Sequence, residues 1–172
     1  MKITFILPSV GRKDGQKKYI KTWCMEPLAI AQLAALTPPD IQTEFFDDRL
    51  EKINYDTTTD LVAINIEAYT AKRAYEIAEQ YKKRGKQIVM GGFHATLMPE
   101  EVREHADAVV VGEAEGVWLE VINDYQSNQL KKIYQSKTVP SLEGILPDRS
   151  IYQNKKFLKL GLMETGRGCN YN

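Results

Sequence analysis

The stretch "KQIVMGGFHATLMPEEVREHADAVVVGE" (residues 86–113) decides the fold class of this chain. It contains two short apolar runs, at 86–92 and 107–113, on either side of a stretch that opens with Pro99 and two glutamates. Proline at the first helical position and acidic residues in the first turn favour the start of a helix, here over 98–106. Short apolar runs of this kind are typical of parallel strands that are covered on both faces. The stretch therefore predicts a strand–helix–strand unit.

The same alternation extends through the first part of the chain. Further strands are predicted at 2–9, 41–47 and 60–67, and further helices at 26–37, 70–85 and 116–126. In the helix at 70–85 apolar residues recur at helical spacing, with Thr70 placed to cap its start and Gly85 to close its end. Five strands interleaved with helices predict a doubly wound, Rossmann-like α/β domain, and right-handed crossovers favour the flavodoxin-like strand order 2-1-3-4-5.

Beyond residue 126 the pattern weakens. The segment 127–172 contains Pro140 and Pro147 but no long periodic stretch. We therefore predict one domain over residues 1–126, followed over residues 127–172 by a connector and the beginning of a second unit.

Charge and hydropathy exclude some functional classes. The 23 basic and 23 acidic residues give a net charge of zero, so the basic footprint of a nucleic-acid-binding protein is missing. No apolar run approaches the roughly 20 residues of a membrane span. The apolar N-terminus runs into Pro8 without a signal-peptide cleavage site, and two cysteines make no disulfide framework. These features predict a cytoplasmic protein that binds neither nucleic acid nor membrane.

The predicted strands end in residues that suit ligand binding. In sheets of this class, ligands bind at the carboxyl ends of the strands. Glycine, which lacks a Cβ, lets the backbone approach a large planar or phosphate-bearing ligand closely. The candidate site residues at four strand ends are Ser9 and Val10; Glu67, Ala68, Tyr69 and Thr70; Gly91, Gly92, Phe93 and His94; and Gly112, Glu113 and Glu115.

Each strand end also has a simpler interpretation. Gly91 and Gly92 can serve only to turn the chain after a buried strand. His94 can be a hydrogen-bonded loop histidine, while Glu113 and Glu115 can be solvated carboxylates in a first helical turn. Neither a G-x-G-x-x-G fingerprint after the first strand nor a phosphate-binding Walker loop occurs in the sequence. The convergence of four such strand ends favours a ligand site.

Several motifs together resemble one known family. They are "EPLAIAQLAAL" (26–36), "GGFHATLMPEE" (91–101), "ADAVVVGEAEGVWLEVI" (106–122) and "GRGC" (166–169). Over essentially its whole length the chain resembles the N-terminal cobalamin-binding domain of cobalamin-dependent radical S-adenosylmethionine (SAM) enzymes. The resemblance implies that Ser9 and Val10 lie beside the corrin ring, that residues 67–70 line its lower side, that residues 91–94 give room to the nucleotide tail, and that Gly112, Glu113 and Glu115 border the far rim.

The motif "GRGC" has its own implication. In the family it introduces a C-x-x-x-C-x-x-C motif, whose three thiolates hold a [4Fe–4S] cluster that binds SAM. The resemblance makes Cys169 the first metal ligand of that motif, with the chain ending inside it. The cluster, SAM and a radical SAM barrel in cis would then belong only to a full-length protein. That protein would methylate or rearrange a small-molecule substrate, whereas the fragment alone would not be catalytic.

One departure from other cobalamin domains lies after the first strand. Many of those domains carry a cobalt-ligating histidine there, in D-x-H-x-x-G, but this chain reads "SVGRKDGQKKY" (9–19) without histidine. The missing histidine argues against ordinary histidine-ligated binding and is compatible with the radical SAM relatives, many of which leave cobalt without a protein histidine; the lower axial ligand of cobalt stays open at this point. The alternative function is a stand-alone flavodoxin-like module without catalysis, which binds a nucleotide or flavin or docks a partner.

Overall fold

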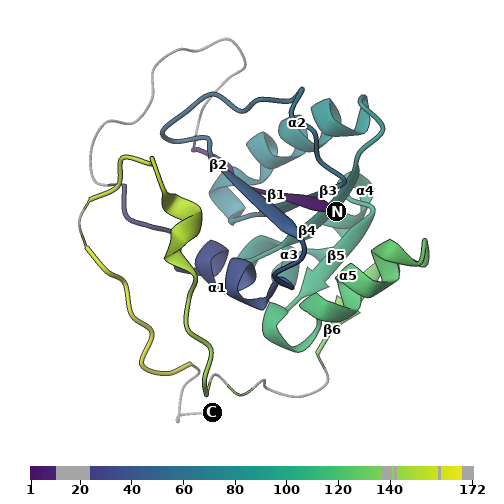
Figure 1. Cartoon of the computed structure of the whole chain (residues 1–172). Coiled ribbons are helices and arrows are strands. Elements are labelled where there is room, and N and C mark those ends of the chain that lie inside the picture. Colours follow the sequence, from purple (N-terminus) through teal and green to yellow (C-terminus); the bar gives the residue numbers. More distant parts are fainter. Residues whose placement is uncertain (11–23, 137–140, 142, 159, 168–172) are drawn as a thin grey trace.

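A single parallel sheet forms the centre of the molecule (Figure 1). The computed structural model describes residues 1–10, 24–136, 141, 143–158 and 160–167. The strands are β1 (Lys2–Leu7), β2 (Gln42–Asp47), β3 (Leu61–Asn65), β4 (Gln87–Gly91), β5 (Ala108–Val111) and β6 (Ile133–Gln135). Their order is β2-β1-β3-β4-β5-β6. All neighbours pair in parallel, so every carboxyl end lies at the same edge of the sheet.

The predicted order 2-1-3-4-5 is confirmed, but the predicted number of five strands is wrong. The sixth strand, β6, extends the sheet beside β5, with Val109 opposite Ile133 and Val111 opposite Gln135. It lies in the segment that was predicted as a connector. Strand β6 has only three residues, and only the central one, Tyr134, is buried. So short a segment with polar neighbours shows no apolar run or alternation from which a strand could be predicted.

The helices are α1 (Leu28–Leu36), α2 (Ala71–Lys82), α3 (Phe93–Leu97), α4 (Pro99–His105) and α5 (Trp118–Gln126), with 3-10 turns η1 (Ala68–Thr70), η2 (Ala114–Gly116) and η3 (Arg149–Tyr152). The four predicted helices are confirmed with shifted ends. Helix α3 was not predicted, because its five residues are too few to show a period. Gly85 closes α2 with φ of 71°. The expected cap by Thr70 is wrong, since its hydroxyl bonds the backbone of Glu67 instead.

Two hydrophobic cores lie on the two faces of the sheet. Helices α1 and α5 cover one face, where Phe5 and Ile30 pack with Trp118, and the rings of Phe5 and Trp118 are 5.9 Å apart. Helices α2, α3 and α4 cover the other face, where Ile77 and Tyr81 are completely buried. Burying side chains of this size stabilises the fold by about 1.5–3 kcal/mol each. Within the described ranges, no helix is long and apolar enough to cross a membrane.

Part of the C-terminal segment packs against the sheet face that α1 and α5 cover. The ring of Tyr152 lies 5.7 Å from that of Phe45, and its hydroxyl donates to the carbonyl of Pro27. The backbone N–H of Asp148 donates to the carbonyl of Ala31 on α1 at 2.9 Å. Figure 1 shows this segment in yellow-green beside α1. The division of the chain at residue 126 stays a prediction.

Candidate functional site

An apolar cavity of about 160 Å³ opens at the carboxyl ends of β3, β4 and β5, between the sheet, α1 and α5. We call it the α1–α5 cavity. Small side chains on the three strands leave this space, and the cavity wall comes from α1 and α5. Its apolar lining includes Ala63, Val89, Val110, Leu33, Leu36 and Trp118. The indole N–H of Trp118 donates to the hydroxyl of Thr37 at 3.0 Å, which fixes the ring at the cavity wall.

Five of the predicted site residues line this cavity. They are Gly91, Gly92, Gly112, Glu113 and Glu115. A Cβ at Gly91 would stand 3.5 Å from the Cβ of Val110, in ordinary contact, so the missing side chain leaves room in the cavity without relieving strain. Gly91 thus leaves space in the cavity as well as ending β4.

Gly92 is required by the backbone itself. Its φ is 106°, and a Cβ there would stand 2.2 Å from Asn65 Oδ1 and 2.8 Å from the carbonyl oxygen of Ile66. That close approach lets the Ile66 N–H donate to the Gly91 carbonyl at 2.8 Å and the His94 N–H donate to the Ile66 carbonyl at 3.1 Å. The carboxyl ends of β3 and β4 are therefore bound together, and the chain turns directly into α3.

The other predicted residues lie outside the cavity. Val10, Tyr69 and Phe93 follow β1, β3 and β4 with 53%, 69% and 62% of their surface exposed. We call these three the edge group, because they are exposed apolar residues at the carboxyl edge of the sheet. Ala68 is exposed as well, Glu67 is half-buried, and Ser9, Thr70 and His94 are buried.

His94 belongs to a polar cluster on the second face. Its Nε2 lies 3.4 Å from Glu101 Oε1, and the Tyr75 hydroxyl donates to the same oxygen at 2.8 Å. The hydrogen bonds from Tyr75 and then His94 lower the pKa of Glu101. Burial raises the pKa of Glu67, and the nearby His94 opposes that rise. His94 thus has a carboxylate partner on α4, in agreement with its interpretation as a hydrogen-bonded histidine.

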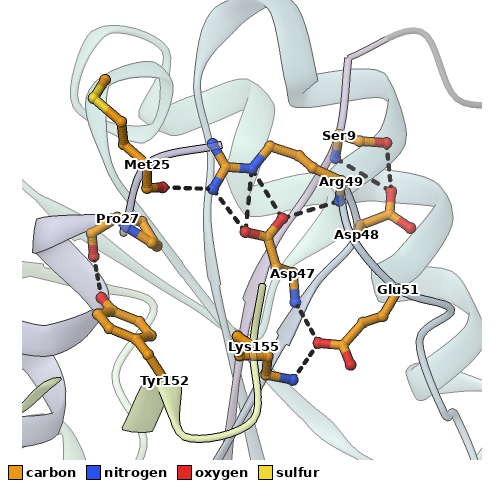
Figure 2. Close-up of polar contacts among 9 residues, drawn as sticks. All are labelled: Ser9, Met25, Pro27, Asp47, Asp48, Arg49, Glu51, Tyr152 and Lys155. Carbon is orange, nitrogen blue, oxygen red and sulfur yellow. Dashed lines mark hydrogen bonds and ion pairs between the residues drawn. The ribbon is translucent and has the colours of Figure 1, made fainter. Parts of the chain in front are cut away.

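Two buried aspartates at the end of β2 were not predicted. Asp47 and Asp48 are both inaccessible to solvent. Asp47 Oδ1 accepts from Arg49 Nε at 2.9 Å and Asp47 Oδ2 from Arg49 Nη2 at 2.6 Å, and Nη2 also donates to the carbonyl of Met25 at 3.1 Å (Figure 2). The side chain of Arg49 thereby ties residue 25 to the end of β2.

Asp48 forms an ion pair with a different arginine, Arg73. It accepts from Arg73 Nε at 2.9 Å and Nη2 at 3.1 Å. The Ser9 hydroxyl donates to the same carboxylate at 2.8 Å, and the Ser9 N–H at 3.2 Å (Figure 2). Asp47 and Asp48, which we call the twin aspartates, therefore anchor both ends of the stretch 10–24. Asp48 binds residue 9 directly, and Asp47 binds residue 25 through Arg49. The sequence "FFDDR" (45–49), with two carboxylates directly after a strand, was the available signal.

The acidic rim of the cavity contacts the C-terminal segment. Arg167 Nη2 lies 2.6 Å from Glu115 Oε1, and the same guanidinium pairs with Glu113. Arg167 itself lines the cavity. The two glutamates are therefore not simply solvated carboxylates of a first helical turn, and the contribution of Arg167 was not predicted.

The part of the chain that the structure describes contains no cluster of three His, Cys, Asp or Glu side chains that could hold a metal ion. Cys169, the predicted cluster ligand, lies outside the described residues. Its assignment stays a prediction.

The fold and the cavity define the class of protein. A doubly wound parallel sheet with an apolar cavity at its carboxyl ends, beside a Gly-Gly turn, is a flavodoxin-like ligand-binding α/β domain. The family model described as the B12 binding domain matches residues 25–122, more than half of the chain. The chain belongs to the B12-binding domain family.

Two curated relatives come from Chlorobaculum tepidum. The chain is 44% identical over 121 residues to its bacteriochlorophyllide d C-8(2)-methyltransferase, covering 70% of this chain and 27% of that protein. It is 31% identical over 188 aligned positions to the bacteriochlorophyllide d C-12(1)-methyltransferase, covering 95% of this chain and 41% of that protein. The chain thus spans well under half the length of either relative.

Among solved structures, the N-terminal domain of a hypothetical protein from Thermotoga maritima aligns with a TM-score of 0.40 and 24% identity. That alignment covers 50% of this chain and 74% of the other.

Proposed function

We propose that this chain is the cobalamin-binding part of a radical SAM methyltransferase. The nucleotide tail of cobalamin would occupy the α1–α5 cavity, and the corrin ring would lie over the edge group. Membership of the B12-binding family and the two methyltransferase relatives support this proposal.

The observation that carries the proposal is the fit of the cavity to a planar aromatic group. A dry apolar cavity of about 150 Å³ suffices to bind benzene. The α1–α5 cavity has about 160 Å³, is floored by Ala63, Val89 and Val110, and lacks a side chain at Gly91. The edge group adds exposed apolar side chains outside the cavity, which suit contact with the face of a large macrocycle.

Bound methylcobalamin would supply the transferable methyl group, while the chain supplies position and shielding from water. We propose a site without a protein histidine on cobalt. The sequence 9–19 contains no histidine, and the Nε2 of His94 already faces Glu101.

The test uses hydroxocobalamin and a cavity-filling variant. After mixing and desalting, we expect the wild-type chain to retain the visible spectrum of cobalamin. Gly91→Val should weaken binding by about tenfold or more, since the cost of overpacking, about 1–3 kcal/mol, falls on the bound state. Gly85→Ala, in a turn remote from the cavity, is the matched control. A wild-type chain that retains no cobalamin would refute the proposal. Retention of flavin instead would favour the stand-alone binding module.

The radical SAM part of the proposal rests on Cys169 and is tested separately. Cysteine codons at the first and fourth positions after that of Asn172 would complete the C-x-x-x-C-x-x-C motif. In the protein that this reading frame encodes, Cys169→Ala should abolish the visible absorption of a [4Fe–4S] cluster. A stop codon directly after Asn172 would remove the radical chemistry and leave a binding module.

Methyl transfer needs its own assay, with methyl-labelled SAM and the full-length protein. Both relatives are named for methylation of bacteriochlorophyllide d, so a bacteriochlorophyllide is the first substrate class to test. A product without label would contradict methyl transfer.

A further inference from the structure

The stretch 164–167 meets the rim of the α1–α5 cavity through one side chain. Arg167 Nη2 lies 2.6 Å from Glu115 Oε1, Arg167 Nε donates to Glu164 Oε1 at 2.8 Å, and the guanidinium also pairs with Glu113. Gln32 Oε1 accepts from Arg167 Nη2 at 3.3 Å. Gln32 lies on α1, whereas Glu115 lies on η2, and both line the cavity. Arg167 therefore joins two of the elements that form the cavity.

These contacts differ from an ordinary surface ion pair. An exposed pair contributes little, because solvent screens it and both side chains lose freedom. Here the Arg167 and Glu115 side chains are only 18% and 6% exposed. Hydrogen bonds to Glu164 and then Glu115 raise the pKa of the Arg167 guanidinium, which therefore stays charged. Charge-assisted hydrogen bonds in a planar arginine fork are also stronger and more directional than neutral ones.

The same stretch has few apolar anchors. Leu160 and Met163, which precede it, are 52% and 84% exposed, so burial holds this part of the chain only weakly. Arg149 donates to the carbonyl of Leu162 and fixes the segment at that point. Beyond residue 162, the described contacts with the rest of the domain come from Glu164 and Arg167. The position of the stretch over the cavity rim thus depends on the polar contacts of Glu164 and Arg167, and the ionic contacts among them are those of Arg167 with Glu113 and Glu115.

We propose that Arg167 is a latch on the α1–α5 cavity, so that a ligand enters or leaves only when the contact between Arg167 and Glu115 opens. Arg167 is a positioning residue: it acts by holding the stretch 164–167 at the cavity rim. The identity of the ligand rests on the proposed function, whereas the latch itself does not.

Two readouts separate these claims. The first is the dissociation rate of hydroxocobalamin from the wild-type chain and from Arg167→Ala. The second needs no cofactor: in a Val110→Cys background, peptide-mapped alkylation by iodoacetamide reports access to the cavity, because Val110 lines it and is 3% exposed. Arg103→Ala is the matched control, since Arg103 pairs with Glu100 on the exposed face of α4.

We expect Arg167→Ala to raise both rates by about tenfold or more, the factor that corresponds to one lost charge-assisted hydrogen bond. Glu115→Gln should do the same, Arg103→Ala should change neither rate, and the thermal midpoints of the variants should stay close to that of wild type. High salt should accelerate release from wild type more than from Arg167→Ala. If wild type retains no cobalamin, the proposed function fails and alkylation alone decides the latch. Alkylation within twofold of wild type in Arg167→Ala would overturn the latch.

Discussion

Replacing Gly92 by alanine tests whether the turn after β4 is dictated by the backbone. Gly92 has φ of 106° and ψ of −172°, a region that is essentially open to glycine alone. The new Cβ would also stand 2.2 Å from Asn65 Oδ1, 2.8 Å from the Ile66 oxygen and 3.0 Å from the Ile66 nitrogen. Asn65 can rotate away, but Ile66 cannot move without stretching its hydrogen bonds to Gly91 and His94.

The magnitude follows from two effects. Strain in a sparsely populated backbone region costs about 1–3 kcal/mol, and forcing an extra methyl group into a packed site costs about 1–3 kcal/mol. We therefore expect Gly92→Ala to lower the free energy of unfolding by about 4 kcal/mol, a large part of the roughly 5–15 kcal/mol of a typical domain.

Urea unfolding followed by circular dichroism measures this loss, with Gly85→Ala as the matched control. Gly85 also has positive φ, at 71°, but a Cβ there would meet no atom within 4 Å. The control should therefore lose only the backbone part, about 1–2 kcal/mol. If Gly92→Ala destabilises the chain no more than Gly85→Ala, the close approach to Ile66 does not matter and the reasoning is refuted.

Three further predictions concern charged and titrating groups. Asp48→Asn should lower the free energy of unfolding by about 3–5 kcal/mol in urea, because it disrupts a buried ion pair, whereas Asp56→Asn, in an exposed pair, should cost under about 1 kcal/mol. A hydrogen bond from Arg167 lowers the pKa of Glu164 below its ordinary 4.5, so the contact between the two is fully present above pH 4.5 and is lost as pH falls through the lower value. Titration of Glu164 followed by NMR should therefore show a pKa below 4.5 in wild type and a higher one in Arg167→Ala, and equal values would contradict the assignment. Burial raises the pKa of the Cys24 thiol, so peptide mapping should show it alkylated about tenfold or more slowly than a free cysteine peptide, and equal rates would show that the thiol is accessible.

The sequence predicted the elements whose burial leaves a pattern. Strands β1, β3, β4 and β5 are apolar runs, and α2 shows its helical period, so their order along the chain was readable. Strand β6 and helix α3 were missed because three and five residues are too short to show a period.

The site residues likewise fall into those that the sequence could predict and those that it could not. The glycines at the ends of β4 and β5 signal a close backbone approach by their identity alone. Ion pairs leave no comparable signal in the sequence, because the two partners are far apart along the chain. Asp48 pairs with an arginine 25 positions away, and Glu113 pairs with one 54 positions away. The contribution of α1 to the cavity wall could not be predicted either, because its apolar residues are equally typical of a helix that only packs against the sheet.

The twin aspartates have a consequence for how this domain can change during evolution. Although Asp47 and Asp48 are adjacent, one carboxylate serves Arg49 and the other serves Arg73. The two adjacent positions should therefore covary with different partners, Asp47 with Arg49 and Asp48 with Arg73. Among related sequences, loss of Asp48 should accompany loss of Arg73 while Asp47 and Arg49 persist, and the reverse exchange should occur independently.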